Sequence, residues 1–258
     1  MVKPLSKRIF MESTNFCQNQ VAGALQPDCT VSFMNLCEEL ARFAAQHDIF
    51  LIPHNEKGLL NFKSLDFEKQ TFITAHLTAY LQQIYQAAFE KITLRGDNRQ
   101  HVWWSLKNLR LVPPSDLLDK ISSDDIIEIY NNEGIQVFRS FELFQHISYS
   151  LSEIFTFTWM ELFERDEFVF KRVFDAVDKV LAGEVTGVVK QQLPPHVLKE
   201  KFSNEKKWIE IQQGVLCPLQ SVNGSLGGYL YSFKILNYGS DAIINPFIST
   251  RASQDLEI

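Results

Sequence analysis

The chain has 258 residues and a mass of 29.8 kDa, which corresponds to one large domain or two small ones. Hydrophobic residues make up 45% of the chain and charged residues 22%, and this balance excludes wholesale disorder. The sequence contains no apolar run long enough for a transmembrane helix, and residues 1–10 lack the apolar stretch of a signal peptide. Its four cysteines form no CxxC pair, so we expect reduced thiols in a cytoplasmic protein.

The net charge of −6 is unevenly distributed along the chain. Residues 1–113 carry 12 Lys and Arg against 10 Asp and Glu, whereas residues 114–258 carry 13 against 21. Because duplex binding depends on neutralising phosphates, the acidic C-terminal half is not expected to bind nucleic acid. Phenylalanine occupies 21 positions, and so much rigid ring surface needs a core, a pocket or an interface.

In chain order, residues 1–30 are polar and irregular, which is typical of a loosely ordered arm. Residues 31–48 have apolar positions three and four residues apart, and this spacing predicts a helix. A short apolar run follows at residues 49–52, and residues 55–58 have the composition of a turn.

Residues 66–92 give the strongest helix signal of the N-terminal half. One apolar stripe runs through them without Gly or Pro, and Asp66 is the predicted N-cap. Such a stripe packs either within the chain or against a second copy of the helix, so this helix is a candidate for a dimer contact or for relaying a signal. The candidate residues are Ile73, Leu77, Tyr80 and Ile84.

Residues 100–112 fit either a strand or a helix that ends early. Pro113 and Pro114 continue neither element, so we expect a domain boundary there. The predicted organisation is a mainly helical N-terminal region at 31–113, a second domain at 114–237 and a C-terminal extension at 238–258.

The second domain begins with a predicted β-hairpin, in which the strands at 125–130 and 135–138 flank a turn that contains Gly134. Short apolar helices follow as far as residue 163. Asp166 is then expected to cap a longer helix that ends at Gly183.

Three predicted strands complete this domain, at residues 185–193, 207–216 and 226–236. Residues 190–206 are polar and long for a connection between strands, and Asn223-Gly224 forms a tight turn. The order of elements predicts an α+β fold, in which an antiparallel five-stranded sheet carries helices on one face.

The segment from about residue 120 to residue 237 resembles a PAS domain in four places. The stretch IEIYNNEGIQVF (127–138) is similar to the opening hairpin of that family, and ISYSLSEIFTFTWMELFERDE (147–167) to its short helices. The stretch FKRVFDAVDKVLAGE (170–184) is similar to its long helix, and KWIEIQQGVLCPLQSVNGSLGGYLYSFKI (207–235) to its last hairpin. The four pieces follow the order of the family and cover slightly under half of the chain.

PAS modules bind small molecules or partner proteins and relay a change in shape to an output element. The resemblance implies a pocket between the inner face of the sheet and the long helix, with one of Tyr231 and Phe233 facing inward. A filled core without a ligand is the alternative for these aromatic side chains. The candidate pocket residues are Phe138, His146, Trp159, Phe170, Phe174, Val177, Ile211, Tyr229, Tyr231 and Phe233.

The resemblance also bears on cofactors. Haem-binding members of the family carry a His on the long helix, and light-sensing flavin members carry a reactive Cys among the short helices. This sequence has neither, since its PAS-like segment contains only Cys217, on the last hairpin. We therefore expect no cofactor, and neither the haem mode nor the covalent flavin mode.

Sequence motifs of catalysis are missing. There is no GxSxG elbow, no GxxxxGK[ST] loop and no GxGxxG fingerprint, and the six histidines include no HExxH pair. We expect neither an enzyme nor a metal site, and an enzyme with an unrecognised site stays as an alternative.

The leading hypothesis is a cytoplasmic signalling protein, homodimeric and without membrane contact. Its PAS-like domain would sense a small apolar molecule or a partner protein and move the N-terminal helices. A second hypothesis is a transcription-linked regulator that binds nucleic acid through residues 91–110, where basic and aromatic residues such as Arg99, Trp103, Trp104 and Arg110 alternate.

Overall fold

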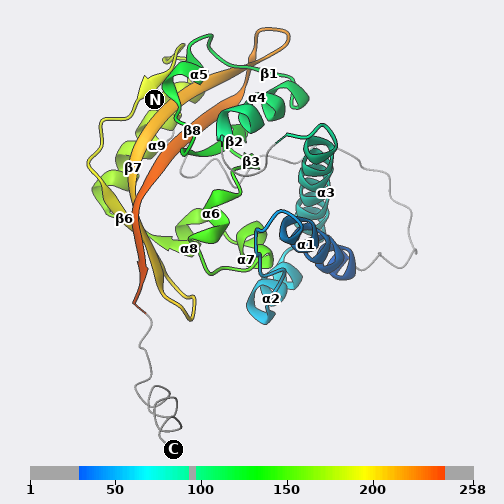
Figure 1. The fold of residues 1–258 in the computed structure, drawn as a ribbon. Helices are drawn as coiled ribbons and strands as arrows, with labels where there is room; N and C mark the ends of the chain where they lie inside the picture. The colour runs from blue at the N-terminus through cyan, green and yellow to red at the C-terminus, as the bar shows by residue number, and fades with distance from the viewer. Residues whose placement is uncertain (1–28, 93–96, 242–258) are drawn as a thin grey trace, which may run out of the picture.

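A curled antiparallel sheet forms the centre of the fold in the computed structural model, which describes residues 29–92 and 97–241 (Figure 1). Its spatial order is β3-β2-β8-β7-β6-β4, and the short strands β1 and β5 both pair with β7. The strands within the described residues are β1 (Leu111–Val112), β2 (Ile126–Asn131), β3 (Gln136–Arg139), β4 (Phe163–Glu164), β5 (Val189–Lys190), β6 (His196–Glu200), β7 (Lys207–Ser221) and β8 (Leu226–Ser240).

Helices surround this sheet (Figure 1). They are α1 (Cys29–Ala45), α2 (Glu56–Ser64), α3 (Phe67–Phe89), α4 (Asn98–Asn108), α5 (Leu117–Lys120), α6 (Glu142–Gln145), α7 (Leu151–Thr156), α8 (Trp159–Leu162) and α9 (Glu167–Leu181). The mixture of helices and antiparallel strands confirms the predicted α+β class. No helix of the described residues is both long and apolar enough to cross a membrane.

Side-chain caps explain where the main helices begin. Asp66 accepts a hydrogen bond from the backbone N–H of Lys69 at the start of α3, and Asp166 accepts one from Val169 at the start of α9. Both caps were predicted from the sequence. Gly183, expected to end the longer helix, has a φ of 76° two residues beyond α9.

The two faces of the sheet are covered by different parts of the chain. Tyr231 and Leu230 are neighbours in β8 and point to opposite faces. The face of Tyr231 is turned towards α9. On the other face Leu230 pairs with Ile129, and Ile129 pairs with Phe138, whose ring meets that of His101 in α4 at 4.9 Å. Helices therefore cover both faces, and the expectation of helices on one face was wrong. The second face is covered by α4, which comes from the N-terminal region and not from the predicted sheet domain.

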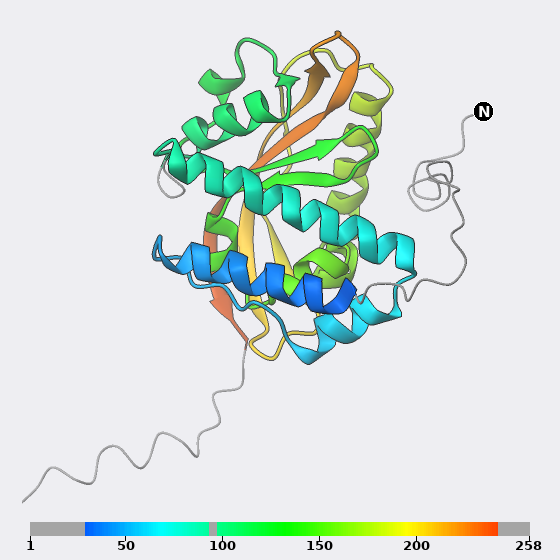
Figure 2. The ribbon, with the colours of Figure 1, turned by 90° about the vertical axis from the view of Figure 1, so that its right-hand side faces the viewer.

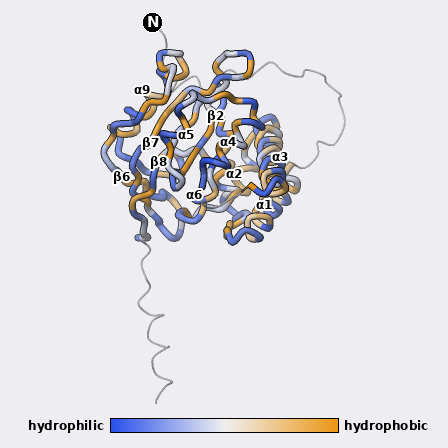
Figure 3. Tube along the Cα trace, turned by 45° about the horizontal axis from the view of Figure 1, so that its top comes forward, coloured by the Kyte–Doolittle hydropathy of each residue, from blue (hydrophilic) through white to orange (hydrophobic). Residues whose placement is uncertain are grey.

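The N-terminal helices α1 and α3 lie side by side across one flank of the molecule (Figure 2). Apolar and polar residues alternate along both helices, as they do along the strands (Figure 3). Hydrogen bonds join this region to the PAS-like segment: the backbone N–H of Leu151 donates to the carbonyl of Ile52, and the amide of Asn98 donates to the carbonyl of Asp125. Residues on both sides of Pro113 and Pro114 thus contribute to one hydrophobic core.

Several predicted elements differ from the structure. Residues 55–58 are not a turn: the Asn55 side chain accepts a hydrogen bond from Gly58 N and thereby caps α2. Residues 100–112 form the end of α4 and then β1, so the helical alternative holds. Predictions for residues 1–28 and 242–258 lie outside the described residues.

The strand assignments after α9 also need correction. Only Val189–Lys190 of the predicted strand 185–193 pairs with β7, and β6 lies within 190–206, where a connection was expected. Pro194 and Pro195 interrupt this edge and cannot donate to the ladder, so the strand is divided in two. The main path of the sheet has six strands: β2, β3, β7 and β8 correspond to predicted strands, whereas β6 and the two residues of β4 lie where no strand was predicted.

Candidate functional site

A cavity of about 150 Å³ lies between α3 and the edge strand β3, and we call it the α3–β3 cavity. Within residues 29–92 and 97–241, β2 is the single strand that pairs with β3, and the outer edge of β3 faces α3 across this space. The lining comes from α3, the β2–β3 turn, β3, α6 and α7. The lining residues are Phe72, Ile73, His76, Tyr80, Ile135, Gln136, Phe138, Arg139, Phe144, Ile154 and Phe155.

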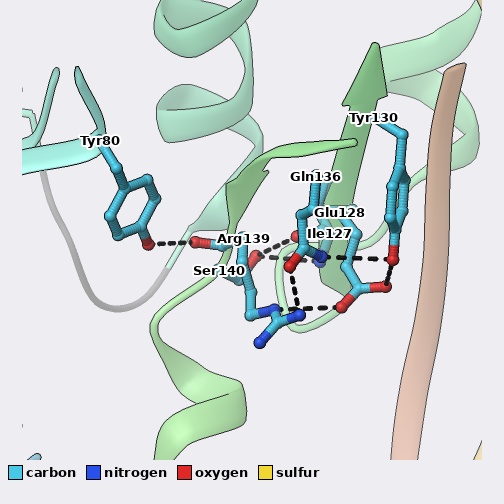
Figure 4. A network of polar contacts seen from close by, with 7 residues as sticks. All are labelled: Tyr80, Ile127, Glu128, Tyr130, Gln136, Arg139 and Ser140. Atoms are coloured by element: carbon cyan, nitrogen blue, oxygen red, sulfur yellow. Dashed lines mark hydrogen bonds and ion pairs between the residues drawn. The ribbon is translucent and has the colours of Figure 1, made fainter. Parts of the chain in front are cut away.

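Beside the cavity, Arg139 forms a buried ion pair with Glu128 (Figure 4). Its Nε lies 3.2 Å from Glu128 Oε1, and the two side chains are only 7% and 4% exposed. The guanidinium also stacks over the Trp159 ring of α8, 4.7 Å from its centroid. A charge pair so far from water is costly unless each partner has further contacts, and this pair has them.

Polar contacts extend from the ion pair along β2 and β3 (Figure 4). The Tyr130 hydroxyl donates to Glu128 Oε2 over 2.7 Å, and the Gln136 amide donates to Tyr130 over 3.3 Å. Gln136 in turn accepts a hydrogen bond from Arg139, which closes a ring of four side chains. Burial and the adjacent Glu128 carboxylate raise the pKa of Tyr130 well above its usual value, so Tyr130 stays a donor.

Tyr80 connects α3 to this site. Its hydroxyl donates to the backbone carbonyl of Arg139 over 2.9 Å, at the outer edge of β3. His76, one helical turn earlier, has a pKa lowered by burial and by the charge of Arg139. The neutral imidazole of His76 and the hydroxyl of Tyr80 therefore face the cavity from the same helix.

Several buried polar atoms on the inner face have no hydrogen-bond partner among the described residues, and two of them lie next to the ion pair. They are Trp159 Nε1, under the Arg139 guanidinium, and the hydroxyl of Tyr231, which pairs in register with Glu128. Both are buried donors, and buried donors normally find an acceptor. Next to the ion pair, the Trp159 indole N–H and the Tyr231 hydroxyl are thus available to donate a hydrogen bond.

The structure distributes the ten predicted pocket residues over several places. Phe138 lines the cavity, and Trp159, Tyr229 and Tyr231 lie at the polar network, where Tyr229 stacks on Tyr130 with centroids 4.8 Å apart. Tyr231 and Phe233 are two residues apart and share one face of β8, so the expectation that only one faces inward was wrong.

The remaining predicted pocket residues lie away from the α3–β3 cavity. His146 packs against the ring of Tyr238 at the end of β8, and Phe170 and Phe174 contact each other on α9 with centroids 4.5 Å apart. Val177 is partly buried on α9, and Ile211 and Phe233 are buried in the sheet.

The stripe predicted for a dimer contact or a relay packs inside the chain. Leu77 and Ile84 are 0% and 1% exposed, while Ile73 and Tyr80 line the cavity. A dimer contact through this stripe is excluded by its burial, and the relay role stays a prediction.

A larger cavity of about 320 Å³ lies between the α1–α2 connection and the segment from α6 to α7. Its lining includes the exposed apolar side chains of Phe50 and Ile52 together with Glu205 and Lys207. His146 lies nearby, and burial lowers its pKa, although the charge of Glu142 acts in the opposite direction. The cavity holds no buried charge pair comparable to Glu128 and Arg139.

Residues 91–110 offer less stacking surface than their composition suggested. Trp104 is 5% exposed, and its indole N–H donates to Glu90 over 2.7 Å. Trp103 is exposed, and the guanidinium of Arg99 pairs with Asp97 at 2.6 Å. No group of three His, Cys, Asp or Glu within the described residues is arranged to hold a metal ion.

Sequence reasoning missed Glu128, Tyr130, Gln136 and Arg139. The first three lay inside segments that were correctly predicted as strands, Arg139 lay directly after the second of these strands, and only the strands were inferred. A signal was present, since Glu128 stands among isoleucines in Ile-Ile-Glu-Ile and Arg139 ends the apolar run Val-Phe-Arg. A charge in the middle of a buried strand requires a partner, and that requirement points to the site.

Comparison with known proteins adds little to this geometry. No family model matches the chain, and no curated protein matches its sequence. Among solved structures, the chain is similar to a sensory box sensor histidine kinase from Vibrio cholerae. The match has 16% sequence identity, covers 48% of this chain and 89% of that one, and has a TM-score of 0.26. A TM-score of this size carries no argument, so any functional conclusion depends on the site itself.

Proposed function

We propose that the protein is a non-catalytic sensor, in which a small molecule occupies the α3–β3 cavity and alters the packing of α3 on the sheet. The observation that carries this proposal is the position of the cavity, which lies between the long N-terminal helix and the edge of the PAS-like sheet. The PAS resemblance supports it, since a hairpin, short helices, a long helix and further antiparallel strands follow in the expected order.

The cavity suits a molecule with a single aromatic ring. A cavity of about 150 Å³ in a protein core is known to admit benzene, whereas drug-sized ligands need at least about 300 Å³. Its walls include the rings of Phe72, His76, Tyr80 and Phe155, which favour offset or edge contacts with another ring. Arg139 and Gln136 supply polar groups at one side, so the ligand would carry a hydrogen-bond acceptor.

Signalling requires that the ligand bind two states with different affinity. Tyr80 holds α3 to the Arg139 carbonyl, and a ligand in the cavity touches both sides of this connection. Occupancy would thus favour one position of α3 relative to β3. The buried ion pair would keep its position on the sheet while α3 moves, because Glu128 and Arg139 each make several contacts.

Ligand-dependent stabilisation tests the proposal. Benzoate, benzamide and toluene are added to the full chain, and the melting temperature is measured by scanning calorimetry. A ligand at one hundred times its Kd stabilises a folded protein by about 2.7 kcal/mol. We expect benzoate or benzamide to raise the melting temperature more than toluene does.

Variants identify the site of binding. Ile154→Phe fills the cavity without touching the polar network, and Leu59→Phe is a matched control on α2, outside the lining. We expect Ile154→Phe to abolish the stabilisation and Leu59→Phe to retain it. Equal ligand stabilisation of both variants, or none of the wild type by any of the three probes, would reject the proposal.

A further inference from the structure

The outward face of α3 lacks charge over more than five helical turns. From residue 70 to residue 89 the helix contains no Asp, Glu, Lys or Arg. A helix face exposed to water normally carries charged residues. The outward positions, all exposed, are instead Phe72, Ala75, Ala79, Gln82, Gln86 and Phe89, which we call the outer seam of α3. Its two end residues, Phe72 and Phe89, are 46% and 88% exposed.

The spacing of the outer seam is that of a helix–helix contact. Its positions alternate between three and four residues apart, as the a and d positions of a heptad repeat do. The seam is also complementary to its own reverse, since each end carries a Phe and each Ala corresponds to a Gln. In an antiparallel pair of such helices, a positions meet d positions of the other helix, which places Phe72 against Phe89, Ala75 against Gln86 and Ala79 against Gln82.

We propose that this seam binds a second copy of the chain, in an antiparallel two-fold arrangement of the α3 helices. The seam complements itself: each large side chain in its middle faces an alanine, and no charge has to be desolvated. A two-fold interface uses one patch on both subunits, and this patch meets that requirement. Among the elements that the structure describes, none lies over α3 in the view onto this flank, where α1 lies beside it (Figure 2).

The size of the seam predicts weak association. Residues 72–89 span about 27 Å of helix, and one helix face buries less than the roughly 800 Å² per partner of a standard interface. Glutamines at seam positions fix the register and reduce affinity. We therefore expect a dimer with a Kd of about 1 to 100 µM.

Sedimentation equilibrium of the full chain tests the proposal, over concentrations from about 1 to 200 µM. Ala79→Glu places an unpaired charge in the middle of the seam and should weaken dimerisation at least about tenfold. Ala182→Glu introduces the same exposed change after α9, on the other side of the sheet, and should leave the Kd unchanged. Far-UV circular dichroism checks that each variant keeps its helices.

The combination of Ala79→Glu with Gln82→Lys tests the orientation. In the antiparallel pair, the carboxylate introduced at position 79 faces the ammonium introduced at position 82 of the other copy, so the double variant should recover a Kd within about threefold of the wild type. In a parallel pair each new charge would face itself, and dimerisation would stay lost. A monomeric wild type, an unaffected Ala79→Glu variant or an unrestored double variant would each overturn the proposal.

Discussion

The buried pair of Glu128 and Arg139 allows a quantitative prediction. At 3.2 Å and an effective dielectric constant of about 20, two unit charges attract each other by about 5 kcal/mol. The substitution Arg139→Met keeps the length and apolar stem of the side chain but leaves the Glu128 carboxylate buried without its counter-charge. Breaking one side of a buried pair costs about 3–5 kcal/mol, so we expect this loss in the free energy of unfolding.

Urea denaturation followed by circular dichroism measures the loss, provided that the slope of the transition stays unchanged. The double substitution of Glu128→Leu with Arg139→Met removes both charges and leaves an apolar pair of similar volume. Such replacements are often neutral or stabilising, so the double variant should be more stable than Arg139→Met alone. A cost below about 1 kcal/mol for Arg139→Met, or a double variant less stable than the single one, would refute the reasoning.

Three further predictions concern other parts of the molecule. His101 is 2% exposed and burial lowers its pKa to about 4, so the unfolded chain takes up a proton between about pH 6.5 and 4. Stability should therefore fall by about 3 kcal/mol as the pH drops through this range, and the non-titrating His101→Gln variant should lack this part of the loss in urea denaturation at each pH. In Gly58→Ala, the new Cβ would lie 2.7 Å from the backbone N of Glu153 in α7, and calorimetry should show a loss of about 1–3 kcal/mol, while Gly187→Ala, which meets nothing within 4 Å, should change stability little. Burial raises the pKa of Cys217 to about 12, so in peptide mapping iodoacetamide should alkylate the partly exposed Cys29 of the native protein and reach Cys217 only after unfolding.

The elements that sequence reasoning located correctly carry local signals. Asp66 and Asp166 start helices with side-chain caps, and the turn before Gly134, whose φ is 77°, brings two apolar strands together. Such signals act within a few residues and need no knowledge of the rest of the fold. Strand β6 has no such signal, because its residues become a strand only through pairing with β7.

The contact between α3 and the candidate site could not be found in this way, since it joins elements that are distant in the chain. Tyr80 and Arg139 are 59 residues apart in the chain, and nothing near either residue indicates that they meet. The apolar stripe of α3 allowed two kinds of packing, and only the three-dimensional arrangement decides between them. The sequence likewise indicates that aromatic residues are abundant on α9, but it does not indicate which aromatic rings line the same cavity.

The contact of α4 with one face of the sheet has a consequence for any attempt to isolate the C-terminal part of the chain. Phe138, 2% exposed on that face, would lose its contact with His101 if the chain were cut at Pro113 and Pro114. An apolar surface that is uncovered in this way promotes association and aggregation. The segment that follows Pro114 therefore depends on a helix that precedes it, and a fragment meant to fold on its own should include α4.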